Sequence, residues 1–334
     1  MTTAAKTIGI ADIVQAAKVI APLVIRTPLQ FSQALSTLYG ANIWFKAEYL
    51  QSIGAFKIRG ASYAISQLND HQVLGGVVTC STGNHGRAVA FAAQKRGIKA
   101  TICMSNLVPD NKVKAIEALG AQVCIVGASQ DEAEAQVLRL ESEQAMVYIP
   151  PFDHPHVIAG QGTIGLEILQ DLPEVDIILA GLSGGGLLGG IGLAVKDTKP
   201  ACKIIGVSMD QGPAMVASLA AKQPIKVPEY ASLADSLGGG IGLQNRHSMA
   251  VVQQVMDHAY LVSELAIAKA MTQLFKLEGL RLEGAAVVGL AALAEHNIDI
   301  AGKHVVLVLS GCNVSDENFE LAQNMAIATM ARAS

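Results

Sequence analysis

The sequence predicts an α/β protein made of open, mainly parallel twisted sheets with helices on both faces. Short β-rich runs alternate with helical stretches between Gly76 and Glu143, which is typical of parallel βαβ units. The chain has 334 residues, more than one hydrophobic core usually accommodates, so two domains are expected. Apolar residues make up 51% of the chain and charged residues 16%, which is enough for two large cores.

The periodicity of apolar residues predicts the individual elements. Ile13, Ala16 and Ile20 follow helical spacing, and Ser263 precedes a helical stretch as a capping residue. Strands are expected at 42–46, 76–80, 100–104, 121–126, 175–182, 203–208 and 304–309. Helices are expected at 10–24, 59–68, 87–96, 110–119, 131–143 and 160–172, after 187, and from 263 and 283.

Composition and charge exclude several classes of function. The formal charge is −4 and no basic run is present, so nucleic acid is not an expected partner. Residues 177–195 carry no charge and could match a bilayer in length, but seven of them are glycine, so we expect a strand, a loop and a buried helix there instead.

The cysteines and the N-terminus indicate the compartment. Residues 1–12 have no apolar signal core, and the five cysteines are scattered without a CxxC pair. Such an unpatterned set favours reduced thiols over disulfides or a zinc site. We therefore expect a cytoplasmic protein that does not associate with membranes.

A lysine in a glycine-flanked stretch is the first candidate for chemistry. Lys57 lies between Phe56 and Ile58, with Gly54 and Gly60 three positions away on either side. Glycine lets a ligand approach the backbone closely, and lysine forms Schiff bases with carbonyl cofactors. Most lysines are solvated surface residues, so this stretch is meaningful only together with others.

Three glycine-bearing loops each follow an expected strand and precede a helix: 81–86, 183–187 and 310–313. Ligands of open α/β sheets bind at the carboxyl ends of strands, where such loops gather. Consecutive glycines at a helix N-terminus expose backbone N–H groups to an anion. Each loop alone could be structural: a glycine-packed turn, an Asn-containing turn at Asn84, or a helix cap at Ser310.

The middle loop also satisfies G-x-G-x-x-G through Gly184, Gly186 and Gly189, so a nicotinamide-dinucleotide oxidoreductase is an alternative. The acidic residue expected at the end of the next strand is missing, since that strand ends at Ser208 and Asp210 comes late.

Five motifs follow one another along the chain: Gly-Ala-Phe-Lys-Ile-Arg-Gly (54–60), Ser-Thr-Gly-Asn-His-Gly (81–86), Gly-Gln-Gly-Thr (160–163), Ser-Gly-Gly-Gly-Leu (183–187) and Ser-Gly-Cys-Asn (310–313). In this order they resemble the fold type II pyridoxal phosphate (PLP) enzymes, within them the serine/threonine dehydratase and serine racemase branch. The resemblance extends from about Ile10 to Asn313.

The resemblance implies a tryptophan synthase β-like fold with a small domain inserted in a larger one. The small domain, residues 49–149, would carry the lysine and the asparagine loop. The large PLP-binding domain would comprise residues 1–48 and 150–334.

The resemblance also implies roles for single residues. Lys57 would hold PLP as a Schiff base and later take the Cα proton, and Phe56 would pack near the ring. Asn84 would bind the ring hydroxyl, Glu283 would also contact the cofactor, and Ser310 would face the pyridine nitrogen. The phosphate would be bound by Ser183, Gly184, Gly185, Gly186 and Leu187.

The substrate would be a small amino acid, gripped through its carboxylate by the loop of Ser81, Thr82, Gly83 and His85, with a further contact from Gly239. A hydroxyl at Ser310 in place of a carboxylate leaves the pyridine nitrogen largely unprotonated, which favours β-elimination. The implied activity is therefore dehydration of a β-hydroxy α-amino acid to a 2-oxo acid and ammonia, in a homodimer.

Two departures qualify the resemblance. Racemases of this branch have serine where this chain has Thr82, whose hydroxyl is bulkier and restricted in rotamer, so a serine-type racemase ranks second. Racemase-like members bind a divalent cation through a Glu at the position of Ser208, so a Mg, Mn or Ca site is in doubt here.

The glycine-rich stretch 231–246 resembles the branch associated with hydroxyectoine breakdown and phenylserine dehydration. It predicts that the substrate is a β-hydroxy amino acid other than threonine, with Arg246 or His247 near its side chain. A structural turn with a solvated arginine is the equally weighted alternative.

Overall fold

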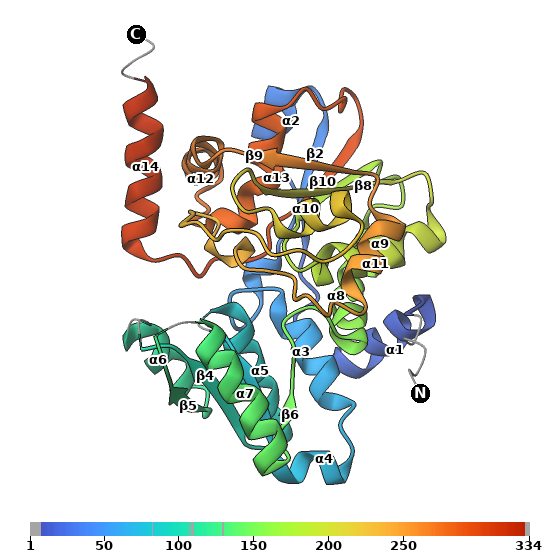
Figure 1. The fold of residues 1–334 in the computed structure, drawn as a ribbon. Coiled ribbons are helices and arrows are strands. Elements are labelled where there is room, and N and C mark those ends of the chain that lie inside the picture. The colour runs from blue at the N-terminus through green and yellow to red at the C-terminus, as the bar shows by residue number, and fades with distance from the viewer. Residues whose placement is uncertain (1–7, 82, 107, 109, 129, 331–334) are drawn as a thin grey trace.

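A computed structural model describes residues 8–330, apart from residues 82, 107, 109 and 129. Within these residues the chain forms two sheets, seen in the upper and lower halves of Figure 1. The six-stranded sheet has the order β1–β2–β10–β7–β8–β9, and its strands are β1 (Leu29–Phe31), β2 (Asn42–Lys46), β7 (Ile177–Gly181), β8 (Lys203–Met209), β9 (His258–Val262) and β10 (His304–Val308).

The smaller sheet is entirely parallel among its described pairings and has the order β5–β4–β3–β6. In the larger sheet only β1 pairs antiparallel, on β2. The strands of the smaller sheet are β3 (Val77–Cys80), β4 (Ala100–Met104), β5 (Gln122–Ile125) and β6 (Val147–Tyr148).

Helices connect the strands and cover both faces of each sheet. They are α1 (Ile10–Ile20), α2 (Gln33–Tyr39), α3 (Lys57–Ser66), α4 (Asp70–Gly75), α5 (Asn84–Arg96), α6 (Asp110–Glu117), α7 (Gln130–Gln144), α8 (Pro155–Asp171), α9 (Gly186–Thr198), α10 (Ala214–Ala221), α11 (Ser248–Val255), α12 (Glu264–Glu278), α13 (Gly284–Glu295) and α14 (Asp316–Met330). Two 3-10 turns, η1 (Glu48–Leu50) and η2 (Asp235–Leu237), lie in the connections.

Alternate residues of the central strands pack into two separate cores, because neighbouring side chains of a strand point to opposite faces. In β7, Leu179 packs with α12 and α13, whereas Ile178 packs with α8 and α9. In β3, Val78 packs against α7 and Val77 against α3 and α5. Burial on both faces explains why these strands are continuous apolar runs in the sequence.

These observations confirm the predicted α/β class with two mainly parallel sheets. The strands predicted at 42–46 and 100–104 have those bounds, and Ser263 caps α12 by accepting a hydrogen bond from the Ala266 N–H (3.2 Å). The short elements β1, β6, β9, α2, α4, α10 and α11 were not predicted, and neither was the longer helix α14.

The helix predicted to begin at Gly160 is wrong in its start. α8 begins at Pro155, whose fixed φ suits the first helical position, so Gly160 and Gly162 lie in the helix interior. They are glycines because other helices cross there: an added Cβ at Gly160 would lie 2.7 Å from the Arg59 carbonyl oxygen, and one at Gly162 would lie 2.9 Å from that of Gly190.

Helix α3 lies between the two sheets and packs against α5 on one side and α8 on the other (Figure 1). At its crossing with α8, the Gly60 N–H donates to the Gln161 side-chain oxygen (3.1 Å). A Cβ on Gly60 would lie 2.8 Å from the Val157 carbonyl oxygen. The small residues at this crossing therefore bring Lys57, at the start of α3, to the junction of the sheets.

The uncharged stretch 177–195 divides into β7, a glycine loop and α9, as predicted. None of the described helices combines the length and apolar character that a membrane span needs.

Gly60→Ala is expected to lower the free energy of unfolding by about 1–3 kcal/mol, because the new methyl group overpacks a backbone contact. Gly289→Ala, also inside a helix, is the control: its nearest neighbours are side-chain atoms of β7 and β10 at 3.3 Å, and the higher helix propensity of alanine offsets a small shift. Urea unfolding measures both changes. Equal effects in the two variants would contradict the close α3–α8 crossing.

Candidate active site

Lys57 is the first residue of α3 and is half-buried. Its Nζ donates a hydrogen bond to the Pro151 carbonyl oxygen (2.8 Å) and lies 5.3 Å from the centre of the Phe56 ring. Burial lowers the pKa of Lys57 to about 8, although the nearby charge of Glu283 raises it in part. A lysine with this pKa is partly neutral near physiological pH, as a nucleophilic amine requires.

The end of β10 lies directly beside the lysine stretch. The Phe56 N–H donates to the Ser310 carbonyl oxygen (3.0 Å), and Ala55 forms an antiparallel bridge with Gly311. Ser310 itself is buried. The predicted residues Phe56, Lys57 and Ser310 are therefore neighbours, although about 250 residues separate the two segments in sequence.

Asn84 and Glu283, both predicted at the cofactor, contact each other. The Asn84 amide donates to both carboxylate oxygens of Glu283 (2.9 and 3.1 Å), and its oxygen accepts from the Asn313 amide (2.6 Å). Asn84 begins α5, and Glu283 is the N-cap residue of α13. A Cβ on Gly311 would lie 2.5 Å from the Glu283 carboxylate, so this carboxylate is packed against the end of β10.

Burial raises the pKa of Glu283 to about 7, and the Asn84 hydrogen bond opposes this shift. The charge of Asp235 adds to the rise. A carboxyl group in this state changes its protonation close to neutral pH.

The predicted loop follows β7, but its last two residues, Gly186 and Leu187, already belong to α9. Gly185 is the N-cap residue of α9 with φ +86°. A left-handed residue at this position favours glycine. The Phe152 ring lies so close to Gly184 that an added Cβ would be 2.1 Å from its carbons. The loop thus presents bare backbone at the positive end of a helix dipole, which suits a phosphate group.

The predicted substrate loop precedes α5. Gly83 is the N-cap residue, and its N–H donates to the Ser81 hydroxyl (3.3 Å). The His85 ring is buried and its Nε2–H donates to the Ile149 carbonyl oxygen (2.8 Å), which leaves Nδ1 without a partner among the described residues. Burial, with the nearby charge of Lys57, lowers the pKa of His85 to about 3, so the ring is neutral.

Three other predicted positions are Thr82 and Gly239, expected at the substrate, and Ser208, expected at a possible metal site. Thr82 lies outside the described residues. Gly239 has φ +88°, and no heavy atom lies within 4 Å of the position that a Cβ would take there. Ser208 is buried in β8, and the described part of the chain holds no group of three or more metal-ligating side chains.

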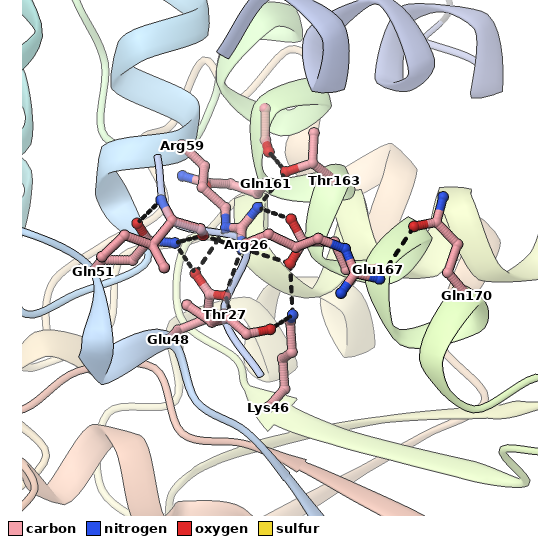
Figure 2. A network of polar contacts seen from close by, with 12 residues as sticks. Arg26, Thr27, Lys46, Glu48, Gln51, Arg59, Gln161, Thr163, Glu167 and Gln170 are labelled. Carbon is pink, nitrogen blue, oxygen red and sulfur yellow. Dashed lines mark hydrogen bonds and ion pairs between the residues drawn. The ribbon is translucent and has the colours of Figure 1, made fainter. Parts of the chain in front are cut away.

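A buried ion network lies behind the start of α3 (Figure 2). Arg59 is fully buried and donates to Glu48 (2.8 Å) and to both oxygens of Glu167 (2.7 and 2.8 Å). Lys46 donates to Glu167 and to the Thr27 carbonyl oxygen, both at 2.6 Å. Burial lowers the pKa of Arg59, but the charges and hydrogen bonds of Glu48 and Glu167 more than reverse this and keep it raised.

Comparison with known proteins identifies the family. The sequence profile of the pyridoxal-phosphate dependent enzymes matches residues 20–311. The chain belongs to this family.

Its relatives include an L-threonine ammonia-lyase of Thermotoga maritima, 40% identical over 92% of this chain and 76% of that protein. The structure of maize serine racemase has a TM-score of 0.88 at 34% identity and covers 98% of this chain and 100% of that chain. The processed threonine deaminase isoform 2 of Solanum lycopersicum has a TM-score of 0.89 at 31% identity, with coverage of 98% and 91%.

Family membership implies pyridoxal phosphate as the cofactor, and the site fits it. The glycine loop supplies backbone N–H groups at a helix N-terminus, and Lys57 supplies an amine of lowered pKa. The dinucleotide interpretation of Gly184, Gly186 and Gly189 is therefore wrong. A Cβ on Gly189 would lie 2.9 Å from Val251, so this glycine serves helix packing.

Sequence reasoning did not find three residues that surround this PLP-enzyme site: Pro151, Phe152 and Asn313. Pro151 lies next to the predicted domain boundary between residues 149 and 150, and no role at the site was predicted for it. Its role depends on a carbonyl oxygen that any residue carries, so no side-chain pattern could have indicated it. Asn313 belongs to a recognised motif, but its contact with Asn84 spans 229 positions.

Glu283→Gln is expected to flatten the pH dependence of stability of the apoprotein between pH 4.5 and 7. The folded carboxyl keeps its proton up to about pH 7, whereas the unfolded one loses it near 4.5, so the folded form binds more protons and is destabilised as the pH rises. The wild type should lose on the order of 3 kcal/mol over this range through this group, and the non-titrating glutamine should not. Urea unfolding at several pH values measures this, and parallel profiles would contradict it.

Arg59→Met is expected to lower the free energy of unfolding by about 3–5 kcal/mol, because it leaves buried carboxylates without their partner. Adding Glu48→Gln removes one of these charges, so the double variant should be more stable than the sum of the single effects predicts. Arg26→Met is the control, since its pair with Asp171 is largely exposed and should contribute at most about 1 kcal/mol. Additive effects in the double variant would contradict the coupling.

Proposed function

We propose that the protein dehydrates a β-hydroxy α-amino acid such as threonine or serine, with pyridoxal phosphate as cofactor, to a 2-oxo acid and ammonia. The observation that carries this proposal is Lys57, an amine of lowered pKa that is bound to Pro151 beside the phosphate-type loop and is influenced by the charge of Glu283. The relatives named threonine ammonia-lyase and threonine deaminase support the substrate class.

Bound pyridoxal phosphate supplies an electron sink for the charge that develops when the substrate loses its Cα proton. Lys57 would hold the cofactor's aldehyde carbon and, once released, accept the Cα proton at Nζ. Its lowered pKa serves both tasks, because a general base works best when its pKa is near the operating pH.

The remaining residues would orient the cofactor. The backbone N–H groups of Ser183–Leu187 would bind its phosphate, and the Asn84 side chain would bind the ring hydroxyl. The buried hydroxyl of Ser310 would face the ring nitrogen, where an uncharged partner favours β-elimination. Glu283 would act through the Asn84 amide that it holds, and Phe56 would pack beside the ring.

Substrate would bind at the start of α5. Ser81, Thr82, Gly83 and His85 would grip the carboxylate, supported by the positive end of the helix dipole. Because the His85 ring is neutral and committed to Ile149 through Nε2, its contribution to the carboxylate would come from its backbone N–H. Gly239, in the loop before α11, would make a further contact with the substrate.

A serine-type racemase is the second candidate, favoured by the likeness to maize serine racemase. Chiral analysis of substrate recovered during turnover distinguishes the two activities.

The narrower resemblance of stretch 231–246 to phenylserine and hydroxyectoine enzymes stays a prediction. Assays of 2-oxo acid formation from phenylserine and hydroxyaspartate isomers test it. Arg246 has an exposed side chain, so it is free to contact a larger substrate.

We further propose that residues 49–149 form a domain inserted between 1–48 and 150–334, in a cytoplasmic homodimer. The inserted range contains all four strands of the smaller sheet, which supports this division. The described cysteines are all free thiols, in keeping with a reducing compartment.

Lys57→Ala is expected to abolish 2-oxo acid formation and to remove the borohydride-reducible absorbance of bound pyridoxal phosphate. In the wild type, reduction should leave the cofactor attached to a peptide that contains Lys57, detected by mass spectrometry. Lys95→Ala is the control, because that lysine is on the outer side of α5 and should change neither result. Turnover by Lys57→Ala, or a colourless wild type in the presence of added pyridoxal phosphate, would overturn the proposed function.

A further inference from the structure

Three consecutive residues after Pro150 contact three different parts of the site. The Pro151 carbonyl oxygen accepts the hydrogen bond of Lys57 Nζ (2.8 Å). The Phe152 ring lies against Gly184 of the glycine loop, and an added Cβ on Gly186 would also meet Phe152 at 3.1 Å. Asp153 follows directly. The position of this short segment therefore affects both the lysine and the phosphate-type loop.

Asp153 is bound to the start of α11, more than 90 residues away in sequence. Its carboxylate accepts three backbone hydrogen bonds, from Arg246 (2.7 Å), His247 (2.8 Å) and Ser248 (2.8 Å). His247 is the N-cap residue of α11 but forms no side-chain cap, so Asp153 satisfies N–H groups that would otherwise be free. Its charge also lies at the favourable end of the helix dipole.

Helix α11 in turn supports the glycine loop. A Cβ on Gly185 would lie 2.7 Å from Val252 and 3.4 Å from the Ser248 carbonyl oxygen. One on Gly189 would lie 2.9 Å from Val251. The glycine loop is thus packed between α11 and Phe152. The hydrogen bonds of Asp153 join the segment that carries Phe152 to α11.

We propose that Asp153 is a positioning residue for the cofactor: by holding the start of α11, it sets Phe152 against the glycine loop and the Pro151 carbonyl against Lys57. This inference rests on the proposed function. A residue that only capped α11 would change stability and nothing at the site. A positioning residue changes cofactor affinity and the environment of Lys57 as well.

The three hydrogen bonds of Asp153 to the start of α11 are called the Asp153 clamp, and two alterations are expected when it is lost. In Asp153→Asn, one carboxylate oxygen becomes an amide N–H group that opposes a backbone N–H, so the segment 151–153 shifts. The glycine loop then loses its lateral contact, and Lys57 becomes more accessible to water. Burial is the main cause of the lowered pKa of Lys57, so that pKa should rise toward its ordinary value.

The experiment compares apoproteins of the wild type, Asp153→Asn and Glu295→Gln. Glu295 is the matched control because its carboxylate also binds a distant helix start, accepting from the Ser263 N–H (2.9 Å) and hydroxyl (2.7 Å) before α12. For each protein we would measure the melting temperature, the affinity for pyridoxal phosphate by absorbance titration, and the pH midpoint of Lys57 labelling by an amine-reactive reagent, read by mass spectrometry.

Asp153→Asn should weaken pyridoxal phosphate binding at least tenfold and move the labelling midpoint of Lys57 upward by about one pH unit or more. Glu295→Gln should lower the melting temperature without either change. An Asp153→Asn protein that melts earlier but keeps wild-type affinity and midpoint would show that Asp153 is a helix cap only.

If Asp153→Asn does not fold, Phe152→Leu provides the second test, because it keeps the Asp153 clamp and removes the ring from Gly184. It should weaken cofactor binding by a similar factor, and an unchanged affinity would overturn the proposal. A wild-type protein that binds no pyridoxal phosphate would instead contradict the proposed function, so the two failures are distinguishable.

Discussion

The buried ion network around Arg59 determines where the reactive lysine lies. Arg59 is two residues after Lys57 on α3, and its guanidinium is bound by Glu48, which follows β2, and by Glu167 of α8. Lys46 completes the set, so two buried cations face two carboxylates (Figure 2). Such a network contributes little net stability compared with an apolar core, but its hydrogen bonds are lost if α3 and α8 move relative to β2. It therefore specifies the position of α3 between the sheets and, with it, the position of Lys57.

The glycine crossing and the ion network act on the same helix in different ways. Gly60 lets α3 approach α8 closely enough for Arg59 to reach Glu167, because a Cβ at that position would meet the α8 backbone. The directional hydrogen bonds of Arg59 then set the position of α3 along the axis of that helix. A bulkier residue at Gly60 would separate the partners of Arg59 while leaving their charges buried. Gly60, one of the two glycines three positions from Lys57, is thus required for helix packing.

Features that depend on a local residue pattern could be predicted from the sequence. Buried parallel strands such as β4 are apolar runs, and glycine loops between a strand and a helix mark anion sites, so the fold class and the Ser183–Leu187 loop were predictable. The start of α8 was not, because Gly160 in a helix interior is explained only by α3 passing over it. The Asn84–Glu283 contact and the Asp153 clamp join residues about 200 and 90 positions apart, and nothing in either neighbourhood indicates its partner.

Burial sets the acid–base character of the site by moving two groups in opposite directions. It lowers the pKa of Lys57 to about 8 and raises that of Glu283 to about 7, so both change protonation within a narrow range around neutral pH. The two are also coupled, since the charge of Glu283 raises the pKa of Lys57. Below pH 7 Glu283 becomes neutral, and Lys57 loses a nearby negative charge that favours its protonated form. Burial then dominates the pKa of Lys57, so protonation of Glu283 lowers that pKa and makes the amine easier to deprotonate. A site with this coupling keeps a fraction of reactive amine over a wider pH range than a lysine of fixed pKa would.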